Sequence, residues 1–186
     1  MNRVGEFEKV SFEQYYEAIK DEFYKGQEMT PALQENIKKS WETLQLPSRA
    51  TSGSAGYDFK VPFSFSLDAG DTIKIPTGIR VKVDEGWWLG CMTGGGLGFL
   101  PRGALGLKSR LQLDNTMGVI DSDYYYSDNE GHIFAKITND NHTGKTLTVE
   151  AGSGFLQAIF IPYGVTYSDD ATGVRNGGMG STDSKS

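Results

Sequence analysis

The sequence predicts a mainly β fold, a barrel or sandwich, preceded by an N-terminal helical appendage. The hydrophobic period changes once, near Leu46, from helical spacing to short runs that are rich in β-branched and aromatic residues. Glycine and proline interrupt the later runs at close intervals, and no long helical segment separates them. Many short strands without helical crossovers favour an all-β barrel or sandwich over a βαβ fold.

Two helices are predicted before Leu46. Ser11 is the expected N-cap of the first, whose apolar residues recur at helical spacing: Phe12, Tyr15, Tyr16, Ile19 and Phe23. Thr30 is the expected cap of the second and Pro31 its first residue, and its apolar stripe consists of Leu33, Ile37, Trp41 and Leu44. Each helix is too short to be stable alone, so we expect the pair to pack on the body or on a neighbouring subunit.

Strands are expected in the β-branched and aromatic runs after Leu46, which span residues 57–67, 69–83, 86–92, 132–140, 145–152 and 155–167. The C-terminal stretch 173–186 contains too few apolar groups to pack a core. By composition alone it predicts a frayed tail.

Composition limits the function. The 186 residues suit one domain, and a net charge of −6 argues against broad electrostatic binding to nucleic acid or to an anionic membrane. A polyphosphate ligand would therefore need local arginines or a cation. Cys91 is the only cysteine, which excludes a disulfide framework and a multi-thiolate metal site, and no apolar segment is long enough for a signal peptide or a membrane span. We expect a cytoplasmic protein without nucleic-acid or membrane partners.

Polar residues beside glycines form several short segments that suit phosphate chemistry. Asp58 lies in "SGSAGYDF", Arg102 in "PRGALG", Asp121 and Tyr124 in "GVIDSDY", and Arg175 in "VRNGGMGST". Small residues let backbone N–H groups approach phosphate oxygens, arginine binds them bidentately, and a carboxylate can orient water or hold the hydration shell of Mg²⁺. Each segment alone is more often a solvated turn than a phosphate site.

The order of these segments, with "GSGFLQ" before the last, resembles the five motifs of the homotrimeric dUTPase family. The matching segments are "LPSRATSGSAGYDF", "PRGALG", "NTMGVIDSDY", "GSGFLQ" and "RNGGMGST", which together span residues 46–182. The resemblance implies a dUTPase-like β-barrel or jelly-roll over residues 46–170. The helical appendage over 1–45 precedes it, and a flexible C-terminal arm over 171–186 carries the fifth motif.

The resemblance also implies an enzyme, a dUTP diphosphatase. Such an enzyme hydrolyses dUTP to dUMP and pyrophosphate by Mg²⁺-assisted attack of water on the α-phosphorus, in a homotrimer whose active sites each draw on all three subunits. Asp121 matches the carboxylate that activates the water, and Tyr124 matches the ring that packs under the deoxyribose and excludes a 2′-hydroxyl. Asn115 and Gly118 match the hairpin that reads uracil.

Further residues match the phosphate side of the family's site. Asp58 matches an acid that contacts the metal through water, and Arg102 and Gln157 match phosphate contacts. The arm would close over the triphosphate with Arg175, Gly178, Gly180, Ser181 and Thr182. The tail is then a lid rather than a frayed end.

The third motif also holds residues to which the resemblance gives no role in the chemistry. Asp123 is expected to be structural, with its carboxylate pointing away from Asp121 if the strand continues. Tyr125 and Tyr126 are expected to serve surface or subunit packing.

The chain departs from the family pattern near the phosphates and the base. Gly103, followed by Ala104, stands in the substrate-binding second motif where a serine is usual, and Met179 stands in the fifth where an aromatic ring is usual. The stretch 93–100 looks inserted before the second motif. Two hypotheses stay open: a dUTPase of lowered activity, and a nucleotide-binding or protein-interaction trimer with little turnover. A dCTP deaminase is less favoured, because it needs a glutamate where this chain has an aspartate.

Overall fold

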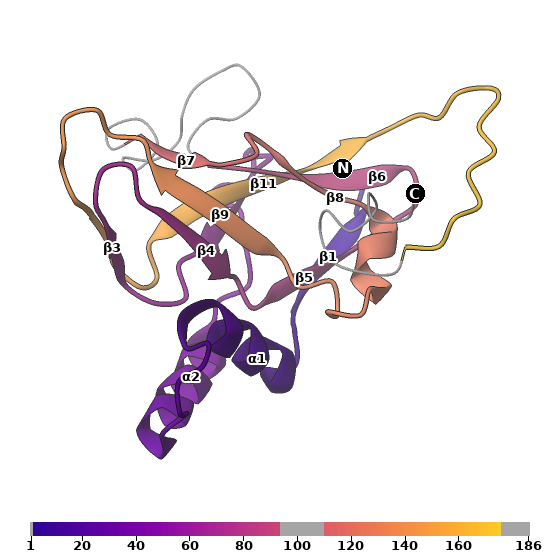
Figure 1. Ribbon diagram of the computed structural model, residues 1–186. Helices are drawn as coiled ribbons and strands as arrows, with labels where there is room; N and C mark the ends of the chain where they lie inside the picture. Colours follow the sequence, from indigo (N-terminus) through magenta and orange to yellow (C-terminus); the bar gives the residue numbers. More distant parts are fainter. Residues whose placement is uncertain (1, 94–109, 176–186) are drawn as a thin grey trace.

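The computed structural model describes residues 2–93 and 110–175, and it begins with a strand and two helices (Figure 1). These are β1 (Gly5–Lys9), α1 (Phe12–Phe23) and α2 (Pro31–Thr43). The strands that follow are β2 (Tyr57–Lys60), β3 (Phe65–Leu67), β4 (Thr72–Pro76), β5 (Ile79–Val83), β6 (Trp87–Met92), β7 (Leu111–Leu113), β8 (Gly118–Ile120), β9 (Phe134–Asn139), β10 (Leu147–Val149) and β11 (Gly154–Pro162). A short 3₁₀ helix, η1 (Ser122–Tyr126), follows β8.

The mainly β fold is confirmed. In the described part of the chain all paired strands are antiparallel, and they form sheets of order β2-β11-β6-β8, β4-β9-β7, β10-β3 and β1-β5. The sheets enclose one core whose most deeply buried side chains include Phe59, Ile75, Leu89, Ile120 and Ile137. The expected runs 57–67 and 69–83 each divide into two strands.

Strands β1 and β7 were not predicted. β1 pairs with β5 along its whole length, from Gly5 opposite Val83 to Lys9 opposite Ile79. The segment before α1 is therefore part of the β body and not of a purely helical appendage. Charged residues alternate with few apolar ones in "GEFEK", so the pattern alone is too weak to indicate a strand.

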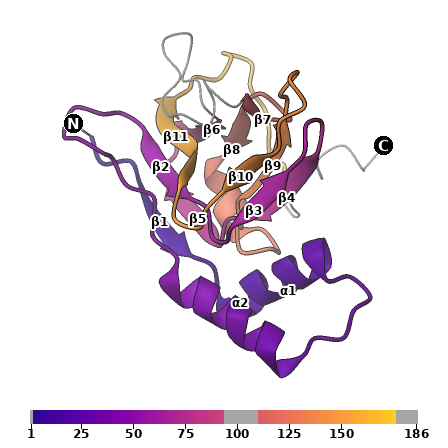
Figure 2. The ribbon, with the colours of Figure 1, turned by 90° about the vertical axis from the view of Figure 1, so that its left-hand side faces the viewer.

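Both predicted helices and both caps are confirmed. The Ser11 hydroxyl accepts a hydrogen bond from the Gln14 amide at 3.1 Å, and the Thr30 hydroxyl accepts one from the Leu33 amide at 3.3 Å. The helices lie together at one end of the β body (Figure 2). They share a second, smaller core formed by Val10, Tyr15, Ile19 and Ile37.

The helices dock on the turn between β4 and β5. Gly78 in this turn has a φ of +72°, and a Cβ there would lie 2.3 Å from Leu44 Cδ1. Its amide donates to Nε2 of buried His132 at 2.8 Å, and its carbonyl accepts from the Val10 amide at 3.0 Å. Burial lowers the pKa of His132 to about 3, so this imidazole is neutral at physiological pH. The expected packing of the helices on the body is thus observed within one chain.

Candidate active site

One four-stranded sheet carries most of the residues that the sequence singled out. Asp58 on β2 lies directly opposite Gln157 on β11, and Gln157 lies opposite Met92 at the end of β6. On the other side of β6, Cys91 lies opposite Gly118 on β8. The first, third and fourth motifs therefore belong to a single sheet, and β6 leads toward the second.

The third motif turns sharply after β8. Asp121 keeps an extended backbone, with φ −78° and ψ 160°, and its carbonyl accepts from the Tyr124 amide at 3.2 Å, which starts η1. Because the strand ends at Ile120, the condition under which Asp123 was expected to point away from Asp121 is not met. Both carboxylates face Arg175, which lies 2.5 Å from Asp121 Oδ2 through Nη2 and 3.0 Å from Asp123 Oδ1 through Nε.

The ring of Tyr124 is held firmly beneath this ion pair. Its side chain is 1% exposed, and its hydroxyl donates to the His132 carbonyl at 2.7 Å and accepts from the Asn129 amide at 2.8 Å. The Arg175 guanidinium carbon lies 5.7 Å from the ring centroid, within cation–π range. The ring is therefore fixed in position by contacts at its hydroxyl and on its face.

The predicted base-reading hairpin borders a cavity of about 210 Å³. Asn115 and Gly118 line it together with Cys91, Ile120, Phe134 and Leu156. Its size suits a single heterocyclic ring rather than a whole nucleotide, since sites for drug-sized ligands span about 300 to 1,000 Å³. Burial raises the pKa of the Cys91 thiol to about 12, so this thiol is uncharged, whereas Lys74, Asp114 and Lys136 place charged groups elsewhere in the lining.

A network that sequence reasoning missed anchors the start of this hairpin. The Asp114 carboxylate pairs with Lys136 Nζ at 2.8 Å and accepts from the Thr138 hydroxyl at 2.5 Å. The hydrogen bond from Lys136, followed by that from Thr138, lowers the pKa of Asp114. Lys136 and Thr138 alternate with the buried residues of β9, and this alternation indicates that both lie on the outer face of the strand. The sequence did not show that they face Asp114.

The candidate metal-side residues form a separate pair. Gln157 Nε2 donates to Asp58 Oδ1 at 2.7 Å. Gly56 leaves room for this amide, because a Cβ at Gly56 would lie 2.3 Å from Gln157 Cδ. Among the described residues there is no group of three or more His, Cys, Asp or Glu side chains that could cage an ion. Asp58 offers the hard oxygen that Mg²⁺ prefers, which fits contact through water.

These groups do not meet within one chain. β2 and β8 are the opposite edges of the four-stranded sheet, so Asp58 and Asp121 lie three strand spacings apart across it, roughly 14 Å, and about four residues apart along it, roughly 13 Å. Asp121, Tyr124 and Arg175 come together, as do Asn115 and Gly118. The remaining site predictions lie outside the described residues: Arg102, Gly103, Ala104, Gly178, Met179, Gly180, Ser181 and Thr182.

Residues 42–183 match the dUTPase family model. The chain belongs to the dUTPase family. Deoxyuridine 5′-triphosphate nucleotidohydrolases from Lactococcus lactis and Haemophilus ducreyi are similar to it, at 34% and 32% identity over 142 residues each. These alignments cover 75% and 73% of this chain, and 88% and 84% of the relatives. The match begins at residue 42, so β1, α1 and most of α2 lie outside it.

Solved dUTPase structures share the fold. The dUTPase from Streptococcus mutans is 36% identical, with a TM-score of 0.55 over 65% of this chain and 88% of its own. A dUTPase mutant from phage phi11 of S. aureus, whose structure describes a structural Mg(II) ion in that protein, is 18% identical. Its TM-score is 0.53 over 71% of this chain and 92% of its own, and at that identity it supports the fold alone.

Proposed function

We propose that this protein hydrolyses dUTP to dUMP and pyrophosphate, with Asp121 activating the attacking water. The observation that carries the proposal is the placement of Asp121 directly after Ile120 and Gly118, which line the ring-sized cavity. A base held in that cavity would have its sugar and phosphates near Tyr124 and Asp121. The family membership supports the same chemistry.

Asp121 acts on the reacting water, and Tyr124 contacts the sugar. A carboxylate within hydrogen-bond reach of a water accepts its proton as the oxygen attacks phosphorus, and such general-base catalysis is worth about 10²- to 10⁴-fold. The buried ring of Tyr124 packs against the deoxyribose and leaves no room for a 2′-hydroxyl. Asn115 supplies amide hydrogen-bonding groups for the edge of uracil.

Arg175 links the C-terminal arm to the reacting groups. In this structure its guanidinium pairs with Asp121 and Asp123, and its side chain is 17% exposed. Phosphate oxygens offer arginine the same bidentate geometry as a carboxylate does. A bound triphosphate would therefore compete for Arg175 and leave Asp121 free to take a proton.

Mg²⁺ is the expected cofactor. Bound to the triphosphate, the ion would neutralise charge that develops on the phosphate oxygens. Asp58 would hold its water shell, because this carboxylate is partly exposed and is oriented by the Gln157 amide.

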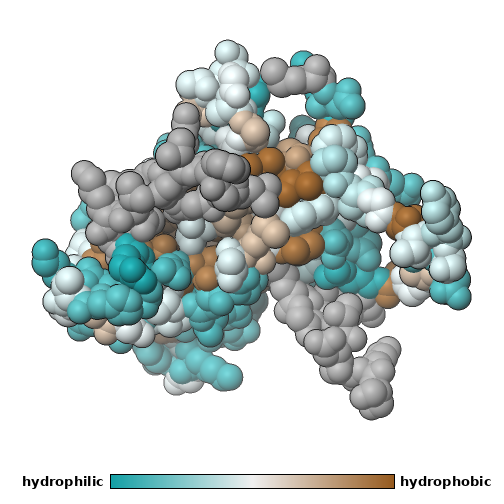
Figure 3. Space-filling view, turned by 90° about the horizontal axis from the view of Figure 1, so that it is seen from above, coloured by the Kyte–Doolittle hydropathy of each residue, from teal (hydrophilic) through white to brown (hydrophobic). Residues whose placement is uncertain are grey.

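The proposed assembly is a homotrimer with shared sites. The separation of Asp58 from Asp121 across the sheet supports a trimer, because a second chain must then bring its Asp58 close to Asp121. Exposed apolar side chains also gather on β8 and on the stretch after β11: Val119, Tyr163, Val165, Tyr167 and Val174. Figure 3 shows hydrophobic surface in the middle of the upper face.

Among the described residues, neither helix is long and apolar enough to cross a membrane.

The test compares the parent with Asp121→Asn, which keeps the size of the side chain but removes the base. We expect pyrophosphate release from dUTP to fall by about 10²- to 10⁴-fold while dUTP affinity changes little. Asp21→Asn, an exposed substitution on α1, is the matched control and should hydrolyse dUTP like the parent. Equal rates for Asp121→Asn and the parent would refute the assignment of Asp121. A parent that binds dUTP without turnover would favour the binding trimer.

A further inference from the structure

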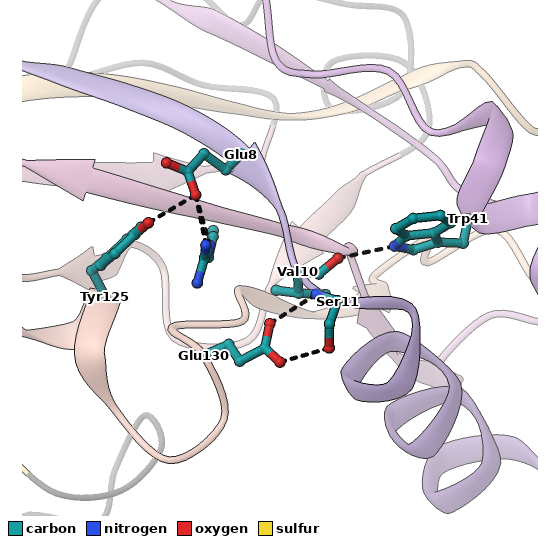
Figure 4. A network of polar contacts seen from close by, with 7 residues as sticks. Glu8, Val10, Ser11, Trp41, Tyr125 and Glu130 are labelled. Atoms are coloured by element: carbon teal, nitrogen blue, oxygen red, sulfur yellow. Dashed lines mark hydrogen bonds and ion pairs between the residues drawn. The ribbon is translucent and has the colours of Figure 1, made fainter.

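The segment before α1 is tied to η1 at one point and to the loop after η1 at a second (Figure 4). At the first, the Tyr125 hydroxyl donates to Glu8 Oε2 at 2.8 Å. The same oxygen accepts from Arg80 Nε at 3.0 Å and Nη2 at 2.7 Å, and the guanidinium lies 4.5 Å from the centroid of the Tyr125 ring. Tyr125 is thus bonded through its hydroxyl and covered on its ring face, both within one chain.

At the second point Glu130 binds the start of α1. Its carboxylate accepts from the Ser11 amide at 2.8 Å and from the Ser11 hydroxyl at 2.6 Å, while the Ser11 side chain also caps α1 through Gln14. The position of α1 is fixed independently, because the Trp41 indole donates to the Val10 carbonyl at 3.0 Å. Glu130 therefore binds a segment, Val10 and Ser11, whose position is also fixed by the hydrogen bond from Trp41.

The backbone between these points is strained and closely packed. Glu130 has a φ of +58°, a conformation that costs a non-glycine residue free energy and persists only where surrounding contacts hold it. Gly131 has a φ of +68°, and a Cβ there would lie 2.8 Å from the Tyr125 Cα atom and 2.9 Å from the Tyr124 carbonyl oxygen. The loop thus lies directly on the backbone of η1.

We propose that residues 5–11 position the third motif for catalysis, with Tyr125 and Glu130 as positioning residues. Tyr125 is the direct neighbour of Tyr124, and η1 begins at the Asp121 carbonyl, so a shift at either tie moves both proposed site residues. Residues 5–11 lie outside the family match, which begins at residue 42. The inference rests on the proposed dUTP hydrolysis.

The kinetic test uses Tyr125→Phe, which removes the hydroxyl, and Glu130→Gln, which removes the negative charge and replaces one acceptor oxygen with an amide NH₂ donor, both with little change of shape. Tyr126→Phe is the matched control, since Tyr126 is the next residue of η1 and is 74% exposed. We expect kcat for dUTP to fall by roughly 3- to 30-fold in Glu130→Gln and by less in Tyr125→Phe, below the loss of about 100-fold that a 1 Å displacement can cause. KM should change less than kcat, and Tyr126→Phe should match the parent.

Hydrogen exchange separates positioning from simple stabilisation and does not depend on activity. The amides of 122–127 should exchange faster in Glu130→Gln than in the parent or in Tyr126→Phe, at a temperature at which all three are folded. A lower melting temperature with unchanged kcat and unchanged exchange at 122–127 would overturn the inference. If the parent does not hydrolyse dUTP, the proposed function fails, and the exchange result alone then decides whether the N-terminal segment holds η1.

Discussion

His132 makes the stability of this protein sensitive to acid. Its side chain is fully buried, and its Nε2 accepts from the Gly78 amide at the turn on which the helices dock. Burial lowers the pKa of His132 to about 3, from an ordinary value near 6.5. As the pH falls below about 6.5 the unfolded chain binds a proton at this residue and the folded chain does not, so acid favours unfolding.

The size of the effect follows from the two pKa values. The contribution of His132 is fully present above pH 6.5 and is lost progressively as the pH falls toward 3. Each pH unit within this window removes about 1.4 kcal/mol from the free energy of unfolding, which gives about 2.7 kcal/mol by about pH 4.5. That is a large part of the about 5 to 15 kcal/mol that is typical of a folded domain.

The assay is urea denaturation at several pH values between about 4.5 and 7.5, at one protein concentration because association adds to stability. His132→Gln should lose this part of the pH dependence, since the glutamine does not titrate. His142→Gln is the control, because His142 is 73% exposed and is the only other histidine. Identical pH dependence in the parent and in His132→Gln would refute the reasoning.

Two further predictions concern the site. Tyr124→Ala should raise the use of UTP relative to dUTP in a competition assay, because it removes the ring that excludes a 2′-hydroxyl; an unchanged ratio would move sugar selection elsewhere. Gly56→Ala should lower kcat by roughly tenfold with little loss of stability, because the new Cβ displaces the flexible Gln157 amide from Asp58 rather than disrupting the core. A kcat equal to that of the parent would show that catalysis does not depend on the contact between Gln157 and Asp58.

Local patterns predicted most of the fold. The caps at Ser11 and Thr30 and the alternation in β9 depend on neighbouring residues, so they could be recognised directly. β1 could not, because its stability comes from pairing with β5, which lies 70 to 78 residues later, from Gly5 opposite Val83 to Lys9 opposite Ile79. A strand supported mainly by a distant partner leaves a weak signal in its own sequence.

The motifs predicted which residues matter but not how they meet. Asp121 and Arg175 are 54 positions apart, and only the return of the arm to η1 brings them together. The orientation of Asp123 depends on where β8 ends, and the pattern could not show that this strand ends at Ile120. Tyr125 was expected at the surface or a subunit contact, yet Glu8, 117 positions earlier, binds it within the chain.

Pyrophosphate release from dUTP, UTP, dTTP and dCTP in the presence of Mg²⁺, with nucleotide binding measured on the same preparation, tests the central claim most directly. We expect dUTP to be hydrolysed to dUMP and pyrophosphate, and UTP, dTTP and dCTP to be used much more slowly. Tight binding of dUTP without release of pyrophosphate, or equal use of all four nucleotides, would contradict it.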